Sequence, residues 1–268
     1  GSNALAANTT GAEGVAVGTN ALDANTTGHN NVGIGYSSLG VNTTGGANIA
    51  VGSYALDANT TADNNIGIGH HALGVNTTGA SNVAIGTNAL DANTTGVENI
   101  AIGPNALGAN TTASSSVAIG SGALLVSTGA RNVAVGASAL DSVTTSNDNT
   151  AVGFVAGSAI TTGEGCVAIG SYALDANTTG GNIAIGRNAL GSNTTGTLNT
   201  AMGYDALFTN VDGDNSTAIG YQALYTQEPS GNVDMYNVMV GHTAGYGLTT
   251  GIRNVGVGAS VLQGAVTG

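Results

Sequence analysis

The amino-acid sequence predicts an all-β chain that folds as a parallel β-solenoid (β-roll) of about 15 coils, with a 17-residue repeat and two short strands per coil. Three observations support this fold class. One motif recurs along the whole chain, each repeat alternates like a strand, and the composition is rich in glycine and medium-sized aliphatic residues but poor in aromatic and charged ones.

The repeat is marked by the string Val-Ala-Ile-Gly or a close variant. Most steps between successive motif glycines are 17 residues long, two are 16, and one is 21. A fixed period of this length is typical of solenoids, because each unit buries its apolar side only by stacking on its neighbours. The motif glycines are Gly18, Gly35, Gly52, Gly69, Gly86, Gly103, Gly120, Gly136, Gly153, Gly170, Gly186, Gly203, Gly220, Gly241 and Gly258.

Two segments of each repeat are predicted strands. With the motif glycine as position 0, positions −3 and −1 are usually β-branched and position −2 is Ala or Gly in all repeats but one, which is strand alternation. The second segment runs from Ala-Leu at +3 and +4 through Asn-Thr-Thr at +7 to +9. Glycine and asparagine close both segments as turns.

Strand alternation also predicts which side chains form the core. We expect positions −3 and −1 to face inward against +4, +6 and +8. The small residues at −2 and the glycines at 0 would then form a smooth outer strip, which either admits a neighbouring chain or only fits the shape of the coil. The asparagines at −4 are expected to stack as a hydrogen-bonded ladder at a tight corner. They include Asn31, Asn48, Asn65, Asn82, Asn99 and Asn132.

The repeat predicts one domain, a single β-solenoid rod over residues 1–268, with an irregular insertion near 225–238. The step that ends at Gly241 carries four extra residues and the turn signal Glu228-Pro229-Ser230-Gly231. Neither end shows a polar capping repeat, which predicts either a longer chain or end-to-end stacking.

The composition excludes several partners. The net charge of −12, with three arginines and no lysine, argues against nucleic acid and against anionic membrane surfaces, and no stretch is apolar enough for membrane insertion. Only 7% of residues are charged, against about a quarter in ordinary soluble domains. So weakly charged a surface is expected to be covered by sister chains, by glycan, or by both.

No pattern indicates an enzyme, so we expect no catalytic residue, no cofactor and no metal site. The Gly-x-Gly strings belong to the repeat, and the histidines lack a partner at zinc-ligand spacing. Cys166 lacks a neighbouring base or cation and is expected to be a buried filler. A depolymerase would have to draw its carboxylates from Asp205, Asp212, Asp214 and Glu228.

Two kinds of residue are candidates for surface function. Tyrosines gather late in the chain, and Tyr221, Tyr225 and Tyr236 are possible receptor contacts that would stack on a sugar. The Asn-Thr-Thr strings are formally glycosylation sequons, although turn formation accounts for them equally well. The possible glycan-bearing residues are Asn8, Asn25, Asn42, Asn59, Asn76, Asn93, Asn110, Asn177 and Asn193.

The strings Asn-Val-Ala-Ile-Gly and Ala-Leu-x-x-Asn-Thr-Thr-Gly resemble repeats of phage tail-fibre proteins and of trimeric autotransporter adhesin heads. The resemblance covers essentially the whole chain, although the 17-residue unit is longer than the adhesin-head unit. It implies a left-handed parallel β-roll, three chains around one axis, and attachment to a surface.

The leading hypothesis is therefore a structural or adhesive fibre segment, homotrimeric, from a phage tail fibre or a cell-surface adhesin. Its location would be extracellular, at the cell surface or on a virion, and its partners would be copies of itself and a cell-surface glycan. Two alternatives remain: a self-assembling extracellular filament that stacks head to tail and carries glycans, and an ice-binding solenoid. Ice binding requires outward Thr rows, and adjacent residues such as Thr94 and Thr95 would supply only one.

Overall fold

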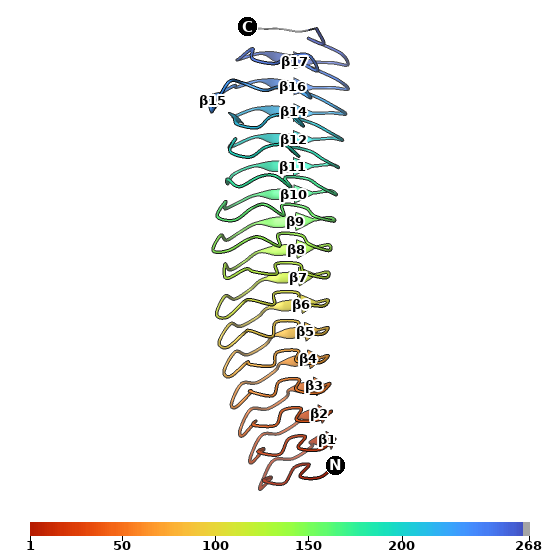
Figure 1. The fold of residues 1–268 in the computed structure, drawn as a ribbon, viewed down its shortest axis with the longest axis vertical. Helices are drawn as coiled ribbons and strands as arrows, with labels where there is room; N and C mark the ends of the chain where they lie inside the picture. Colours follow the sequence, from red (N-terminus) through yellow and green to blue (C-terminus); the bar gives the residue numbers. More distant parts are fainter. Residues whose placement is uncertain (265–268) are drawn as a thin grey trace. The chain divides into compact units, whose positions relative to one another are not determined.

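The structure, a computed structural model, describes residues 1–264. Every regular element in these residues is a β-strand, which confirms the predicted parallel β-solenoid with a 17-residue repeat. The chain divides into two compact units, residues 1–132 and residues 133 to the C-terminus. Within each unit, successive strands stack in the same direction (Figure 1).

The first unit contains seven three-residue strands in one parallel sheet. Neighbours pair in register, so Val83 lies beside Ile66 on one side and Ile100 on the other. Equivalent residues of successive repeats therefore form continuous rows. The strands are β1 (Val15–Val17), β2 (Val32–Ile34), β3 (Ile49–Val51), β4 (Ile66–Ile68), β5 (Val83–Ile85), β6 (Ile100–Ile102) and β7 (Val117–Ile119).

The second unit repeats this plan with one addition. Its stacked strands are β8 (Val133–Val135), β9 (Thr150–Val152), β10 (Val167–Ile169), β11 (Ile183–Ile185), β12 (Thr200–Met202), β14 (Thr217–Ile219), β16 (Val238–Val240) and β17 (Val255–Val257). The predicted insertion follows β14, where β15 (Val233–Asp234) pairs with β13 (Gly213–Asp214) in a separate two-stranded sheet.

The predicted orientation of the strands was wrong, because the core contains position −2 rather than −3 and −1. Ala84 and Ala101 are fully buried, whereas Ile100 on the outer face is 37% exposed. The coil is too thin for two large side chains to meet. A Cβ placed on Gly33 at −2 would already lie 3.2 Å from the Leu22 side chain at +4. Only Ala or Gly therefore fits opposite the leucine row.

The same finding corrects the predicted outer strip of small residues. The −2 residues are inside, and the motif glycines allow the backbone of the next coil to approach closely. Gly86 has φ 134°, and a Cβ there would lie 2.7 Å from the carbonyl carbon of Gly103. A side chain at position 0 would therefore be strained and would force adjacent coils apart.

The second predicted strand is absent, so each coil has one strand rather than two. Residues at +2 and +4 have left-handed backbone, as in Asn88 (φ 54°) and Leu90 (φ 52°), which prevents an extended segment. The backbone still bonds to the next coil, because the Leu90 N–H donates to the Ala106 carbonyl at 2.9 Å. The leucine row is fully buried at the centre of the core.

In two coils of the second unit, a large aliphatic residue lies at position +7 and position +4 is glycine. Position +4 is Gly157 in one and Gly245 in the other, and position +7 holds the buried Ile160 and Leu248 in place of asparagine. A Cβ on Gly157 would lie 2.9 Å from the Leu140 side chain and 3.1 Å from that of Ile160. At Gly157 the aliphatic residue at +7 thus occupies part of the volume that the missing leucine leaves, whereas at Gly245 the nearest side chains are those of Met239 at −2 and Leu224.

Candidate functional site

The asparagines at position −4 join neighbouring coils. All six predicted members of the ladder are buried. The Oδ1 atom of Asn65 accepts the backbone N–H of Asn82 at 2.9 Å, and the Nδ2 atom of Asn65 donates to the Gly79 carbonyl at 2.9 Å. The ladder therefore runs mainly through the backbone of the next coil and has a structural role.

A second asparagine ladder, at position +7, was not predicted. Asn93 is fully buried, and its Nδ2 atom donates to Asn76 Oδ1 at 2.8 Å and to the Gly96 carbonyl at 3.0 Å. Its Oδ1 atom accepts the Nδ2 donor of Asn110 at 3.2 Å. The signal for this ladder is the frequent recurrence of Asn-Thr-Thr, a string that also fits a turn or a sequon.

These contacts bear directly on glycosylation. A glycan is attached at Nδ2, and that atom points into the coil in the buried sequon residues. A glycan is therefore incompatible with the folded coil at Asn25, Asn42, Asn59, Asn76, Asn93, Asn110, Asn177 and Asn193. Asn8 is exposed, although its Nδ2 atom likewise donates to the Gly11 carbonyl at 3.0 Å.

Cys166 replaces an asparagine in the −4 ladder. It is a free, buried thiol whose backbone N–H donates to Asn149 Oδ1 at 2.9 Å. Burial raises the pKa of the thiol, against a smaller lowering by backbone hydrogen bonds. This environment disfavours the reactive thiolate.

The late tyrosines form two stacked columns on three successive coils. At position +1, the Tyr221 ring lies between Tyr204 (ring centroids 5.6 Å apart) and His242 (5.1 Å), with interplanar angles of 14° and 12°. At position +5, Tyr225 lies between Phe208 (5.6 Å) and Tyr246 (5.2 Å). Both ring faces of Tyr221 and of Tyr225 are thus covered.

This packing limits how the predicted receptor contacts could bind. A sugar stacks on an aromatic face, but the faces of Tyr221 and Tyr225 are covered by their neighbours, which leaves ring edges and hydroxyl groups at these two residues. Tyr236, in the insertion, is 46% exposed and has the Arg253 guanidinium 5.9 Å from its ring centroid. Tyr221 and Tyr225 therefore remain candidates for edge contacts and hydrogen bonds rather than for stacking, whereas Tyr236 remains a candidate for both.

The outer side of the strands is the largest feature that the sequence did not predict. We call it the β-face and define it by positions −3 and −1 of the strands in each unit. These positions carry only Val, Ile, Thr or Met, without a charged residue. The in-register pairing places them in two straight rows. Those most exposed within the stacks are about 37% exposed, as in Ile68, Ile100, Ile119 and Ile169.

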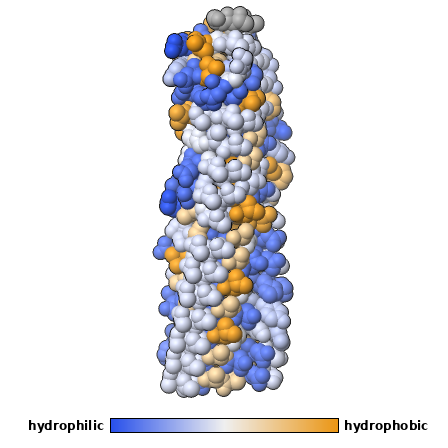
Figure 2. Space-filling view, turned by 60° about the vertical axis from the view of Figure 1, so that its left-hand side comes forward, coloured by the Kyte–Doolittle hydropathy of each residue, from blue (hydrophilic) through white to orange (hydrophobic). Residues whose placement is uncertain are grey.

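The face of the molecule that Figure 2 shows is largely near-neutral, with hydrophilic groups along its sides and hydrophobic groups in a narrow line in the half that holds the first unit. Exposed aliphatic residues outside the β-face include Val41 and Val75 at position +6.

Two carboxylates of the irregular region accept backbone N–H groups. Asp214 Oδ1 accepts the Thr197 N–H at 2.5 Å, and Glu228 Oε2 accepts the Val211 N–H at 2.8 Å, so both cap backbone donors. The buried Asp212 Oδ1 has no hydrogen-bond partner. Across residues 1–264, no three His, Cys, Asp or Glu side chains come together as a metal site. The same residues contain no helix with the length and apolar character of a membrane span.

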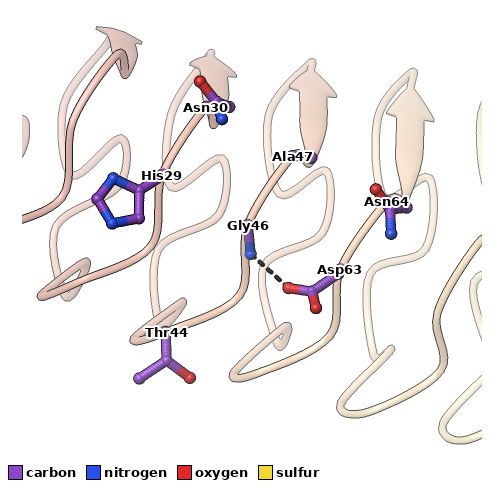
Figure 3. Close-up of a pocket in the computed structure, with 7 residues that line it drawn as sticks. All are labelled: His29, Asn30, Thr44, Gly46, Ala47, Asp63 and Asn64. Atoms are coloured by element: carbon purple, nitrogen blue, oxygen red, sulfur yellow. Dashed lines mark hydrogen bonds between the residues drawn. The ribbon is translucent and has the colours of Figure 1, made fainter.

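One hollow opens on the turn that precedes the strands of the first unit (Figure 3). It has a volume of about 360 Å³ and is lined by His29, Asn30, Thr44, Gly46, Ala47, Asp63 and Asn64. Asp63 and His29 lie on opposite sides of Gly46.

Comparison of the chain with protein-family models, with curated proteins and with solved structures gives no match.

Proposed function

We propose that this chain is a structural segment of an extracellular fibre, of the tail-fibre or adhesin kind, and that copies of it associate through the β-face. The observation that carries the proposal is the uncharged, aliphatic β-face. Contiguous exposed apolar patches of more than a few hundred Å² are rare on monomers and mark interaction surfaces.

The area of the β-face suits a stable interface. Two outward residues on each of seven strands make fourteen residues in the first unit. Seven of the fourteen are at least 36% exposed, so they form an apolar patch that could supply much of the roughly 800 Å² that one partner contributes to an interface of standard size. A second copy fits best, because it presents the same row spacing and the same absence of charge. Elsewhere the copies would repel one another through their net charge of −12.

Three copies is the number that the resemblance to trimeric fibres implies. The first measurement is the solution mass by light scattering. A mass of three chains supports the proposal. Two chains would keep the β-face as the interface and overturn the trimer. A monomer would overturn self-association, and an open-ended mass distribution would favour the head-to-tail filament.

A set of variants assigns the interface. Replacing Ile68, Ile85 and Ile102 by Glu on the −1 row of the β-face is expected to yield monomers, because it buries three like charges. The matched control places Glu at Thr61, Thr78 and Thr95, exposed residues at position +9. If the Glu variant fails to fold, Thr at the three Ile positions keeps β-branching and should still weaken association. Unchanged mass in both variants would exclude the β-face as the interface.

Ice binding has weaker support. The Thr hydroxyls at position +8 donate to the next coil, as Thr77 Oγ1 does to the Thr94 carbonyl at 3.0 Å. Only the row at +9 is exposed, as in Thr78 and Thr95. Thermal hysteresis from a dilute monomer would favour ice binding over the fibre.

A further inference from the structure

The hollow beside Gly46 lies where a contact made between several other pairs of coils is absent. In those pairs the backbone N–H at position +11 of one coil donates to the side chain at +11 of the next, whereas coils followed by Ala80 or Val97 lack the contact as well. Ala12 donates to His29 Nδ1 at 3.1 Å, and Val97 donates to Ser114 Oγ at 3.0 Å. Gly46 itself donates to Asp63 Oδ1 at 2.6 Å. The side chain of the following coil thus supplies the acceptor.

Gly46 cannot supply this acceptor to His29. A Cβ on Gly46 would lie 3.3 Å from the His29 carbonyl oxygen and 3.8 Å from the His29 nitrogen, which shows that the two residues are adjacent. Within the described part of the chain, the His29 N–H has no acceptor. The missing side chain therefore leaves both an open volume and an open donor.

The other side of the hollow offers the complementary group. Asp63 leans toward Gly46, as Figure 3 shows, and its Oδ1 atom binds the Gly46 N–H. Its second carboxylate oxygen has no partner among residues 1–264, and neither do the Asn30, Asn64 and Thr44 side chains. Methyl groups of Ala47 and Thr44 add an apolar part to the lining.

We infer that this hollow binds a neutral sugar, with one hydroxyl oxygen in the place that a +11 side-chain oxygen occupies in other coils. That oxygen accepts the His29 N–H, and its proton is donated to the free oxygen of Asp63. The amides of Asn30 and Asn64 and the Thr44 hydroxyl are available to further hydroxyl groups.

Size and charge favour this class of ligand. The hollow is shallow and open, and its volume of about 360 Å³ is at the small end of ligand pockets, which matches one sugar ring held at the surface rather than a larger, enclosed molecule. The Asp63 carboxylate disfavours anions, because no arginine lines the hollow. The site lies within residues 29–64 and does not depend on self-association through the β-face.

The test follows the His29 backbone amide by NMR during titration with glucose, galactose, mannose and N-acetylglucosamine. We expect a saturable shift of this amide with at least one sugar, with a dissociation constant in the millimolar range that is usual for weak, small ligands. Absence of a shift with all four sugars overturns the proposal. A shift produced by methylammonium and by none of the sugars also overturns it, because the site would then bind cations.

Two matched variants separate binding from stability. Gly46→Ser provides the missing oxygen, as Ser114 does toward Val97, in the place assigned to the sugar hydroxyl, and it should abolish the shift without loss of thermal stability. The same substitution at Ala80, also at position +11 but outside the hollow, should leave binding unchanged. Asp63→Ser keeps an acceptor for Gly46 but removes the carboxylate, so affinity should fall about ten-fold, the value of one good hydrogen bond. Wild-type binding by Gly46→Ser would contradict the proposal.

Discussion

Asparagine holds neighbouring coils together at two positions of each repeat, and the +7 ladder gives the sharper test at the residue scale. Asn93→Ala would leave Asn76 Oδ1 without a donor and Asn110 Nδ2 with only one of its two acceptors, the Ala113 carbonyl. Each buried polar group that loses its partner costs about 1–3 kcal/mol, so we expect a loss of about 2–4 kcal/mol in the free energy of unfolding. The measurement is the midpoint of urea unfolding.

Thr95→Ala is the matched control for this prediction. Thr95 is only two residues away but is exposed, and its substitution should change stability by less than about 0.5 kcal/mol. Equal effects of the two substitutions would show that the ladder contributes little beyond its packing.

The two asparagine rows also show what could be predicted residue by residue. The −4 row was predicted as a ladder because a lone polar residue recurred beside an apolar strand. The +7 row has the same recurrence, but two threonines follow each asparagine. The resulting Asn-Thr-Thr string fits a turn or a sequon, and neither requires the asparagine to be buried. Composition does not distinguish an amide that faces a turn from one that faces a neighbouring coil.

At the scale of the element, the strand was predicted correctly and its orientation was not. Alternation with period two identifies two faces but does not say which one is inside. The usual choice places Val and Ile inward, and it fails here because Leu at +4 already fills a thin coil. The residues Ala-Leu do not indicate the left-handed backbone found at +2 and +4, because leucine rarely adopts that conformation.

Two single substitutions on strand β6 test the orientation. Ala101→Val adds two methyl groups to a fully buried site and is expected to cost about 1–3 kcal/mol through overpacking. Ile100→Thr on the outer face keeps β-branching and is expected to cost less than about 1 kcal/mol. Urea unfolding of both variants under conditions where the chain is monomeric gives the comparison. If Ile100→Thr cost more stability than Ala101→Val, positions −3 and −1 would face the core, as the sequence predicted.

At the scale of the whole molecule, the repeat made the fold class predictable, because in-register stacking follows from any unit that cannot bury its apolar side alone. The surface was less predictable. The hollow beside Gly46 depends on one glycine between two longer polar residues in neighbouring coils. The β-face depends on which side of a strand is inside. Both are properties of stacked coils, which a single repeat does not reveal.

The acidic chain is predicted to gain stability as the pH falls from neutral. Burial raises the pKa of Asp57, Asp91 and Asp175, which lie at position +5, and of Glu228. The charge of His71 lowers the pKa of Asp57 and of Asp91 by a smaller amount. Backbone hydrogen bonds also lower the pKa of Asp91, Asp175 and Glu228, whereas the charge of Asp212 raises that of Glu228 further. Because their folded-state pKa values exceed the unfolded ones, the folded chain binds more protons in the window between them.

Stability from these four groups is therefore fully present below their unfolded pKa values, near 4, and is lost as the pH rises through the folded values. Relief of repulsion within a chain of net charge −12 acts in the same direction. The midpoint of thermal unfolding should rise between about pH 7 and pH 4. Replacing the three aspartates by Asn and Glu228 by Gln should flatten the profile, while Glu13→Gln, at an exposed position, should change it little. A midpoint that falls steadily on acidification would show that these carboxylates are better stabilised as anions in the folded chain than their burial implies.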